Sequence, residues 1–346
     1  MPSKAYRKPA RSHSFLHSFL WITDPWDTLD HAKDTTLRLI EESLKLGYDN
    51  YWCDVHSIRL ENHDVLVSAK KVKGIFPGRG EKAFRFEPQK ELSPLAFSSL
   101  HYRVDPPIDL AYLHPLQLLQ LAFRMEKKKA RKKTKSKIIN PPSYLALANE
   151  KTEAALLADL MPRTLVSSEW QRLEAFGRAE KKTVTKPLHQ AQSKGVTLLE
   201  WPFDPSLEAS KKPLEENKLQ LATLTENFTR PVVLQQYLPG ICEGEQRLWF
   251  VNSKLIAVAR KIPKQGEFKI DMDAGARLAP STLSETESKA ARKISQRLKA
   301  ARIQLAAVDL IEGLVTDFNF TSPGLIPAME SLLGENLAKK IIQALV

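Results

Sequence analysis

Glycine, cysteine and long apolar runs are all scarce in this sequence. Its 346 residues include 13 glycines, about half of the roughly 7% share of an average protein. Two cysteines in so long a chain argue against a disulfide scaffold and favour a reducing cytosol. Cys53 and Cys242 lack the neighbouring cysteines or histidines of a zinc site. No run of about 18 apolar residues occurs, so we expect no membrane span.

Several common catalytic and nucleotide-binding motifs are also absent. The chain contains neither G-x-x-x-x-G-K-[ST] nor G-x-G-x-x-G, the motifs of a P-loop and of a dinucleotide-binding turn. The histidines are scattered, so nothing supports Cys–His or Ser–His–Asp catalysis. We expect no secretory signal, because the apolar stretch Phe15–Trp21 is short and is interrupted by His17 and Ser18. The predicted location is therefore cytoplasmic.

The positive charge is concentrated in one segment. The net charge is +12, and the run Arg124–Lys137 holds nine basic residues and one acidic residue, which leaves +4 for the rest of the chain. Such a run is usually a solvated linker or helix end. The less favoured alternative is a contact with nucleic acid or another polyanion, which is weakened because the run contains no aromatic residue that would stack on bases.

The first third of the chain predicts a β-α-β unit. We expect an apolar strand over Ser14–Thr23, a helix that is capped by Asp34 and ends at Gly47, and a second strand over Tyr48–Val55. Such a unit implies two parallel strands joined by a crossover helix.

The later part of the chain predicts helices among strands with an alternating apolar pattern. Helices are expected over Ser143–Leu160, Trp170–Ala179, Glu285–Ala301 and Glu330–Val346. Leu305–Leu310 and Leu314–Phe320 should be strands that face each other across Glu312-Gly313. The predicted fold class is therefore α/β, with α+β lobes, and the length suits two or three domains.

A candidate metal site lies near the C-terminus. Asp317 and Asn319 alternate along one predicted strand, so both point to the same face, and Asp309 on the neighbouring strand can face them. Two carboxylates and an amide oxygen suit Mg²⁺, which completes its coordination with water and phosphate oxygens. The alternative is a polar strand face that meets solvent.

Further polar segments are compatible with phosphate chemistry. Two lysines could reach phosphates: Lys151 on a predicted helix and Lys186 at a strand end. The segment Leu234–Pro239 could offer backbone groups to an adenine edge, and Glu245 farther along the chain could bind ribose hydroxyls. The loop that begins at Lys261 and closes at Arg277, together with Arg260 before it, places Arg260, Lys261, Lys269 and Arg277 in a cationic cluster that could stabilise a transferring phosphoryl group. Solvated surface lysines and an ordinary exposed loop are the alternatives.

Taken together, these segments resemble bacterial glutathione synthetase, a family of ATP-grasp ligases. The resemblance runs in order from about Ser14 to Val346. The matching motifs are Thr23-Asp24-Pro25, Lys33-Asp34-Thr35-Thr36, Leu44-Lys45-Leu46-Gly47-Tyr48, Asp105-Pro106-Pro107-Ile108-Asp109, Ile139-Asn140-Pro141-Pro142, Ala148-Asn149-Glu150-Lys151, Lys186-Pro187-Leu188, Gln236-Tyr237-Leu238-Pro239 and Asn319-Phe320-Thr321-Ser322-Pro323.

The resemblance implies a domain order and a reaction. Residues 1–126 would form an N-terminal parallel-sheet pre-ATP-grasp domain, 127–137 a basic linker, and 138–346 a two-part ATP-grasp domain, with a small lid at about 163–235 and a metal-binding part at about 236–346. ATP would phosphorylate a substrate carboxylate, and an amine would then attack the acyl phosphate to form an amide. In the family the acid is γ-glutamylcysteine and the amine is glycine. Neither nucleic acid nor a membrane is an implied partner, and a homo-oligomer stays open.

The resemblance also assigns roles to individual residues. ATP phosphates would be held by Lys151 and Lys186, the adenine would be contacted by Gln235, Gln236 and Leu238, and the ribose by Glu245. Mg²⁺ (or Mn²⁺) would be held by Asp309, Asp317 and Asn319. The residues near the reacting phosphate or acid would be Arg247, Lys261 and Lys269.

The sequence departs from the family at the phosphate site. The family has a glycine-rich loop where this chain has His189–Gly195 with a single glycine, and glycine lets backbone amides approach a phosphate closely. Lys261 and Lys269 replace arginines, and Asp317 replaces a glutamate. An active carboxylate–amine ligase is therefore the first hypothesis. A catalytically impaired binding or regulatory protein on the same fold is the second, and polyanion binding through the basic run is the third.

Overall fold

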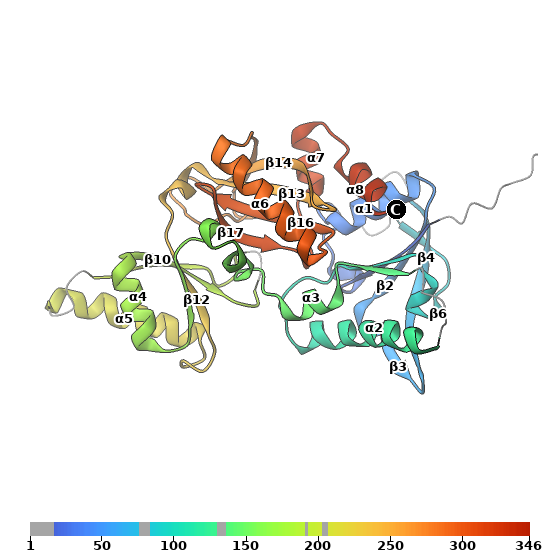
Figure 1. Cartoon of the computed structure of the whole chain (residues 1–346), viewed down its shortest axis with the longest axis horizontal. Helices are drawn as coiled ribbons and strands as arrows, with labels where there is room; N and C mark the ends of the chain where they lie inside the picture. The colour runs from blue at the N-terminus through green and yellow to red at the C-terminus, as the bar shows by residue number, and fades with distance from the viewer. Residues whose placement is uncertain (1–16, 76–83, 130–135, 191–192, 203–206) are drawn as a thin grey trace, which may run out of the picture.

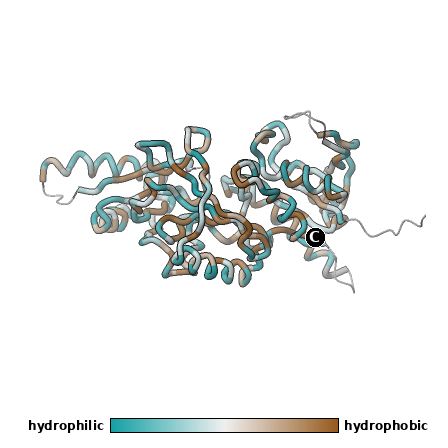
Figure 2. The backbone as a smooth tube through the Cα atoms, turned by 90° about the horizontal axis from the view of Figure 1, so that it is seen from above, coloured by the Kyte–Doolittle hydropathy of each residue, from teal (hydrophilic) through white to brown (hydrophobic). Residues whose placement is uncertain are grey.

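The computed structural model describes residues 17–75, 84–129, 136–190, 193–202 and 207–346, and it contains three β-sheets. Figure 1 shows one sheet at each end of the molecule and the third between them. In Figure 2 apolar segments run mainly along the interior strands, while the outer helices are largely polar. This mixed architecture confirms the predicted fold class.

The first sheet contains the predicted β-α-β unit. β1 (Ser18–Thr23) pairs in parallel with β2 (Asp49–Asp54), and α1 (Thr35–Lys45) joins them. Asp34 caps the helix, because its Oδ1 accepts a hydrogen bond of 2.8 Å from Leu37 N. Gly47, at φ +84°, supplies the left-handed turn after the helix.

Further strands widen this sheet on both sides of the unit. β7 (Ser99–Tyr102) pairs in parallel with β1, and β8 (Lys137–Ile139) pairs in parallel with β7. On the other side β4 (Asp64–Ile75) pairs with β2 in the antiparallel sense. The short strands that pair with β4 are β3 (Arg59–Glu61), β5 (Phe84–Phe86) and β6 (Lys90–Leu92).

The basic run is divided among several parts of the structure. Its first residues, 124–129, end α2 (Leu110–Lys129), and Lys137 opens β8. Residues 130–135 lie outside the described residues. The described part of the run therefore belongs to a helix and a strand, and its proposed contact with a polyanion stays a prediction.

A small antiparallel sheet, called here the lid sheet, has the order β11-β10-β12-β9. Its strands are β9 (Thr164–Ser167), β10 (Lys182–Pro187), β11 (Thr197–Glu200) and β12 (Val232–Gln236), and its helices are α4 (Trp170–Glu180) and α5 (Glu208–Leu224). β11 and α5 were not predicted. Trp201 packs so closely on α4 that a Cβ at Gly177 would lie 2.0 Å from its ring. This lobe has a separate apolar core, which includes Leu173, Trp201 and Leu234.

The third sheet carries the order β15-β14-β13-β16-β17 and is antiparallel throughout. Its strands are β13 (Glu245–Val251), β14 (Lys254–Ile262), β15 (Arg277–Pro280), β16 (Leu305–Ile311) and β17 (Leu314–Asn319). β16 and β17 confirm the predicted strand pair. Their turn uses Glu312 and Gly313, both at positive φ, as a two-residue hairpin requires. The predicted helix Glu285–Ala301 is present as α6, with a capping box between Ser284 and Glu287.

Two of the predicted helices are interrupted. The predicted helix Ser143–Leu160 is divided into α3 (Pro142–Leu147), a turn, and a 3₁₀ helix η5 (Glu153–Leu160). The Asn149 side chain stabilises the turn, because its Oδ1 accepts a hydrogen bond of 3.0 Å from Lys151 N. Lys151 therefore lies in a turn and not on a helix. The second divides into α7 (Ile326–Leu333) and α8 (Leu337–Leu345), because Gly334 adopts φ +67° and ends α7. Among the described helices, none is long and apolar enough to cross a membrane.

Asn140 joins the first sheet to the third. Its side chain follows β8 and is buried at 3% exposure. Its Nδ2 donates to Leu305 O and to Phe320 O, both at 2.8 Å, and its Oδ1 accepts from Gln304 N at 2.8 Å and from Leu305 N at 2.9 Å. The two sheets also share apolar cores, in which Trp21 and Trp249 belong to one cluster. The first and third sheets therefore form one packed body.

We predict that Asn140→Ala destabilises the whole protein. The change leaves buried backbone N–H and C=O groups at Gln304, Leu305 and Phe320, all beside strands of the third sheet, without partners, which should lower the free energy of unfolding by about 3 kcal/mol. Urea unfolding measures the loss. Gln220→Ala, at an exposed position on α5, serves as the control and should change stability by less than about 0.5 kcal/mol. Equal midpoints for the two variants would contradict the role assigned to Asn140.

Candidate nucleotide and metal site

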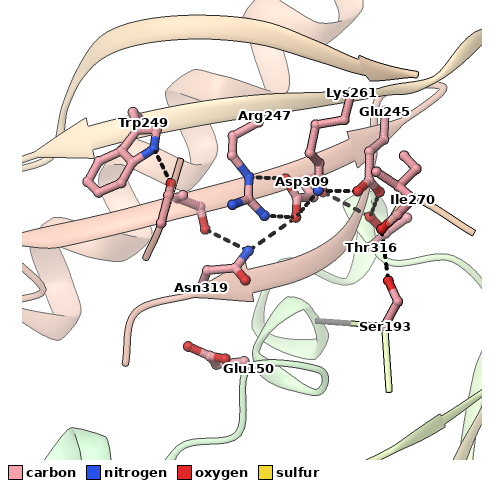
Figure 3. A network of polar contacts seen from close by, with 12 residues as sticks. Glu150, Ser193, Glu245, Arg247, Trp249, Lys261, Ile270, Asp309, Thr316 and Asn319 are labelled. Atoms are coloured by element: carbon pink, nitrogen blue, oxygen red, sulfur yellow. Dashed lines mark hydrogen bonds and ion pairs between the residues drawn. The ribbon is translucent and has the colours of Figure 1, made fainter. Parts of the chain in front are cut away.

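The three predicted metal ligands come together on the hairpin of β16 and β17. Asp309 lies opposite Asp317 in the strand register, and Asn319 lies opposite Ala307. Asn319 Nδ2 is 3.2 Å from Asp309 Oδ2. Figure 3 shows Asp309 at the centre of a network of polar contacts, with Asn319 on the adjacent strand. The predicted juxtaposition of these residues is thus present in the structure.

Asp309 is the most heavily paired carboxylate in this cluster. It is 3% exposed, and Arg247 holds it with two hydrogen bonds, from Nε at 2.8 Å and from Nη2 at 2.6 Å. Lys261 Nζ donates to the same carboxylate at 3.0 Å. Burial alone would raise the pKa of Asp309, but Arg247 and Lys261 lower this pKa well below its usual range. The carboxylate is therefore ionised at neutral pH.

Asp317 is less completely paired. Its Oδ1 is buried and has no hydrogen-bond partner among the described residues. Burial raises the pKa of Asp317, while Lys151 and Lys186 oppose that shift. An unpaired carboxylate oxygen beside an ionised Asp309 suits a divalent cation, which would satisfy it.

The donor set is small for an all-protein metal site. The described residues contain no group of three or more His, Cys, Asp or Glu side chains that could hold a metal ion. Two carboxylates and the Asn319 amide leave several coordination positions for water or phosphate oxygens. That incomplete protein shell is typical of Mg²⁺ sites that also bind a nucleotide.

Both predicted phosphate-binding lysines lie beside this hairpin. Lys186 extends from the lid sheet, and its Nζ donates to Thr316 O on β17 and to Gln235 Oε1, each at 2.9 Å. Burial lowers the pKa of Lys186. Lys151 is 7% exposed, and its Nζ donates to Gln190 O at 2.5 Å. The two ammonium groups therefore lie where the lid sheet meets the third sheet.

Among the residues assigned to adenine and ribose, Gln235 already has side-chain partners and Glu245 lies in the charged cluster around Asp309. The Gln235 side chain is occupied, because its Nε2 donates to Thr164 Oγ1 at 3.0 Å while its Oε1 accepts from Lys186. Gln236 N donates to Arg163 O at 2.9 Å, and Leu238 is buried. Glu245 belongs to the charged cluster and forms an ion pair with Lys261. Adenine and ribose contacts by these residues stay predictions.

Lys269 is not brought into the cluster. It lies half-buried in the loop between β14 and β15, whereas Arg247 and Lys261 both contact Asp309. That loop does touch the lid, since Ser193 Oγ donates to Ile270 O at 3.1 Å (Figure 3). The loop therefore contacts the segment between β10 and β11 of the lid.

Two residues of this site were missed by the sequence analysis. Glu150 is 7% exposed, and its Oε1 accepts from Phe320 N, Thr321 N and Thr321 Oγ1 at 2.6, 2.8 and 2.9 Å. Burial and the charge of Asp317 raise the pKa of Glu150 to about 7. Thr316 is the second, with its hydroxyl 3.3 Å from Glu245 Oε2. A charged residue beside Lys151 and a threonine within a strand carry no sequence signal of such contacts.

Comparisons with known structures give the class of the fold. The chain is similar to D-cycloserine synthetase DcsG, with a TM-score of 0.60 and 15% identity over 94% of this chain and 98% of that one. It is also similar to D-alanyl-alanine synthetase A from Vibrio cholerae, with a TM-score of 0.58 and 12% identity over 95% and 97% of the two chains. A RimK domain protein ATP-grasp from Sphaerobacter thermophilus gives a TM-score of 0.56 and 14% identity over 95% and 98%. The fold is that of the ATP-grasp ligases.

Sequence comparisons give the family. The profile "Prokaryotic glutathione synthetase, N-terminal domain" matches residues 18–145, and "Prokaryotic glutathione synthetase, ATP-grasp domain" matches residues 150–334. Glutathione synthetase of Prochlorococcus marinus is 27% identical over 94% of this chain and 98% of the relative. The Escherichia coli O157:H7 enzyme of that name is 26% identical over 94% and 96%. The chain belongs to the prokaryotic glutathione synthetase family, and it is an ATP-dependent carboxylate–amine ligase, a class that uses ATP and a divalent metal.

We predict that Glu150 makes the stability of the metal-free protein fall as the pH rises. Its pKa is about 7 in the folded chain and 4.5 in the reference state. The folded state therefore binds the extra proton between these values, and stability falls from about pH 5 to 7. Glu150→Gln keeps an acceptor oxygen but does not titrate. In urea unfolding with a chelator, the wild type should lose roughly 3 kcal/mol relative to the variant across this range. Parallel stability curves would show that Glu150 titrates as in the unfolded chain.

Proposed function

We propose that this chain joins γ-glutamylcysteine to glycine at the cost of ATP, by way of an acyl phosphate. The observation that carries the proposal is the meeting of Asp309, Asp317 and Asn319 with Lys151 and Lys186 at one junction of two sheets. The names of the relatives support the choice of acid and amine. Asp309, Asp317 and Asn319 would hold Mg²⁺ or Mn²⁺, which would supply positive charge that offsets the charge of the phosphates.

The side chains of the site act by position and charge. Lys151 and Lys186 would turn from backbone carbonyl partners to phosphate oxygens, which are stronger acceptors for an ammonium group. Arg247 and Lys261 surround Asp309 with fixed positive charge, so this carboxylate stays ionised close to the anionic substrates. The same two cations would stabilise charge on the transferring phosphoryl group. No described side chain needs to form a covalent intermediate in this mechanism.

The loop that begins at Leu188, called here the lid loop, would cover the phosphates without the glycine-rich sequence of the family. Three of its backbone carbonyls accept hydrogen bonds from two segments. From the turn 149–151, Asn149 Nδ2 donates to Leu188 O at 2.8 Å and Lys151 donates to Gln190 O. From the other segment, Ile108 N donates to His189 O at 3.2 Å. Residues 191–192 lie outside the described residues. We therefore place the lid closure on the anchors at Leu188 and His189, which remain when Lys151 turns to a phosphate, and not on a run of glycines.

The proposed domain division follows the earlier expectation. The N-terminal domain would be residues 1–126, 127–137 the linker, and 138–346 the ATP-grasp domain, with the lid at about 163–235 and the metal-binding part at about 236–346. β8 at Lys137–Ile139 pairs with the first sheet, so the linker ends inside that sheet. Small-molecule substrates, a cytoplasmic location and the absence of a nucleic-acid partner belong to the same proposal.

Release of ADP tests the reaction. The full chain is incubated with MgATP, γ-glutamylcysteine and glycine, and each component is omitted in turn. We expect ADP release and a tripeptide product only with all three. Binding of MgATP in calorimetry without ADP release for any dipeptide acid and amino acid would instead support the catalytically impaired protein. A folded chain that shows no heat of MgATP binding would sink the proposal.

We predict that Asp317→Asn abolishes most activity while Asp317→Glu retains it. The amide removes the charge that the unpaired oxygen offers to a cation, and we expect a loss on the order of 100-fold in Mg²⁺-dependent turnover. The glutamate keeps the charge and has the length found in the family. Asp159→Asn is the matched control, because Asp159 forms an exposed ion pair with Lys293. Turnover by Asp317→Asn equal to that of the control would remove Asp317 from the metal site.

A further inference from the structure

Thr316 lies at an irregularity in the strand pair that carries the metal ligands. Asp309 pairs with Asp317, but the next residue, Leu310, pairs with Val315. Thr316 is therefore left opposite no residue of β16, which is the arrangement of a β-bulge. Bulges redirect side chains and are over-represented next to active sites. Thr316 is nonetheless buried, at 7% exposure, so its polar groups need partners within the protein.

The hydroxyl of Thr316 lies between Glu245, the proposed ribose ligand, and Asp309, a proposed metal ligand. Oγ1 lies 3.3 Å from Glu245 Oε2 and 3.2 Å from Asp309 O, so its one proton can be donated to either oxygen. The other carboxylate oxygen of Glu245 pairs with Lys261, as Figure 3 shows. Thr316 and Lys261 together fix both oxygens of Glu245 and so hold its carboxylate in one orientation.

The backbone carbonyl of Thr316 connects the same point to the lid. β17 is the edge strand of the third sheet, so carbonyls on its outer side have no neighbouring strand to pair with. Thr316 O accepts from Lys186 Nζ at 2.9 Å instead. Lys186 is also fixed by Gln235, which in turn bonds Thr164 on the far strand of the lid sheet. One residue thus contacts the proposed ribose acid, the main chain of a metal ligand and a phosphate lysine.

We propose that Thr316 is a positioning residue that orients Glu245 for the ribose hydroxyls of ATP and fixes the resting place of Lys186. This inference rests on the proposed function, because it assigns Glu245 to the ribose. A carboxylate held in one orientation can accept from a ribose hydroxyl without first losing side-chain freedom, which favours binding. Without the Thr316 hydroxyl, Glu245 would keep only its ion pair with Lys261 and its second oxygen would no longer be fixed. The protein would then discriminate less between ATP and 2′-deoxy-ATP.

Calorimetric binding of MgATP and Mg-2′-deoxy-ATP to the full chain tests this role. Thr316→Val removes the hydroxyl but keeps the branched shape and the backbone carbonyl. We expect its affinity for MgATP to fall about tenfold, its affinity for the deoxy nucleotide to change less, and the ratio of the two to approach one. Thr316→Ser restores the donor and should restore the ratio. In turnover with γ-glutamylcysteine and glycine, KM for ATP should rise while kcat at saturating ATP stays within about twofold.

Thr225→Val is the matched control. Thr225 is also fully buried and uses its hydroxyl twice, donating to Leu221 O at 2.6 Å and accepting from Phe228 N at 2.9 Å, but it lies at the end of α5. We expect the control to lose stability without changing the ratio of ATP to deoxy-ATP affinities. If Thr316→Val does not fold, Thr316→Ala against Thr316→Ser makes the same comparison.

The two hypotheses fail in different ways. A wild-type chain that binds neither nucleotide overturns the proposed function, and the role of Thr316 with it. A wild type that prefers ATP, together with a Thr316→Val variant that keeps the same preference, overturns the role of Thr316 alone. An equal loss of both nucleotides in the variant would do the same, because it would indicate a structural effect without orientation of Glu245.

Discussion

The site depends on one buried cluster of charges, in which Arg247 and Lys261 both bond the carboxylate of Asp309. A carboxylate at 3% exposure would be strongly destabilising if it were alone, because burial removes the water that stabilises its charge. Two cations and the Asn319 amide compensate that loss. The strands that carry these residues are neighbours in the third sheet, so the charges are held at fixed distances by the sheet itself. A rigid arrangement of opposite charges is what a site needs if it is to bind anions and a cation together.

The sequence was most informative where strand geometry alone decides the outcome. Alternation along a strand places Asp317 and Asn319 on one face, and a two-residue turn at Glu312-Gly313 brings Asp309 opposite them, so the cluster could be predicted. The β-α-β unit could also be predicted from local sequence, because Asp34 and Gly47 mark the ends of its helix. Both features rest on local rules that involve few residues.

Other parts of the site depend on contacts that no local pattern reveals. The helical periodicity of Ser143–Leu160 gave no sign that Asn149 would form a turn and move Lys151 off the helix. Glu150 is buried only because the main chain at Phe320 and Thr321 returns to it from 170 residues away. The bulge at Thr316 depends on the register of two strands, which the side-chain pattern does not fix to a single residue. The scarcity of glycine did mark the lid loop, whose carbonyls accept hydrogen bonds from two separate segments, at Ile108 and in the turn 149–151.

The separate core of the lid sheet has a mechanical consequence. The first and third sheets bury a common set of apolar side chains, whereas Leu173, Trp201 and Leu234 belong to a cluster confined to the lid. Rotation of the lid as a unit would therefore leave its own core intact and expose none of that cluster. Polar contacts such as Lys186 to Thr316 and Ser193 to Ile270 would be exchanged for contacts with water. Each exchange involves a small net free energy, about 1 kcal/mol, so these two contacts by themselves hold the lid only weakly against the third sheet.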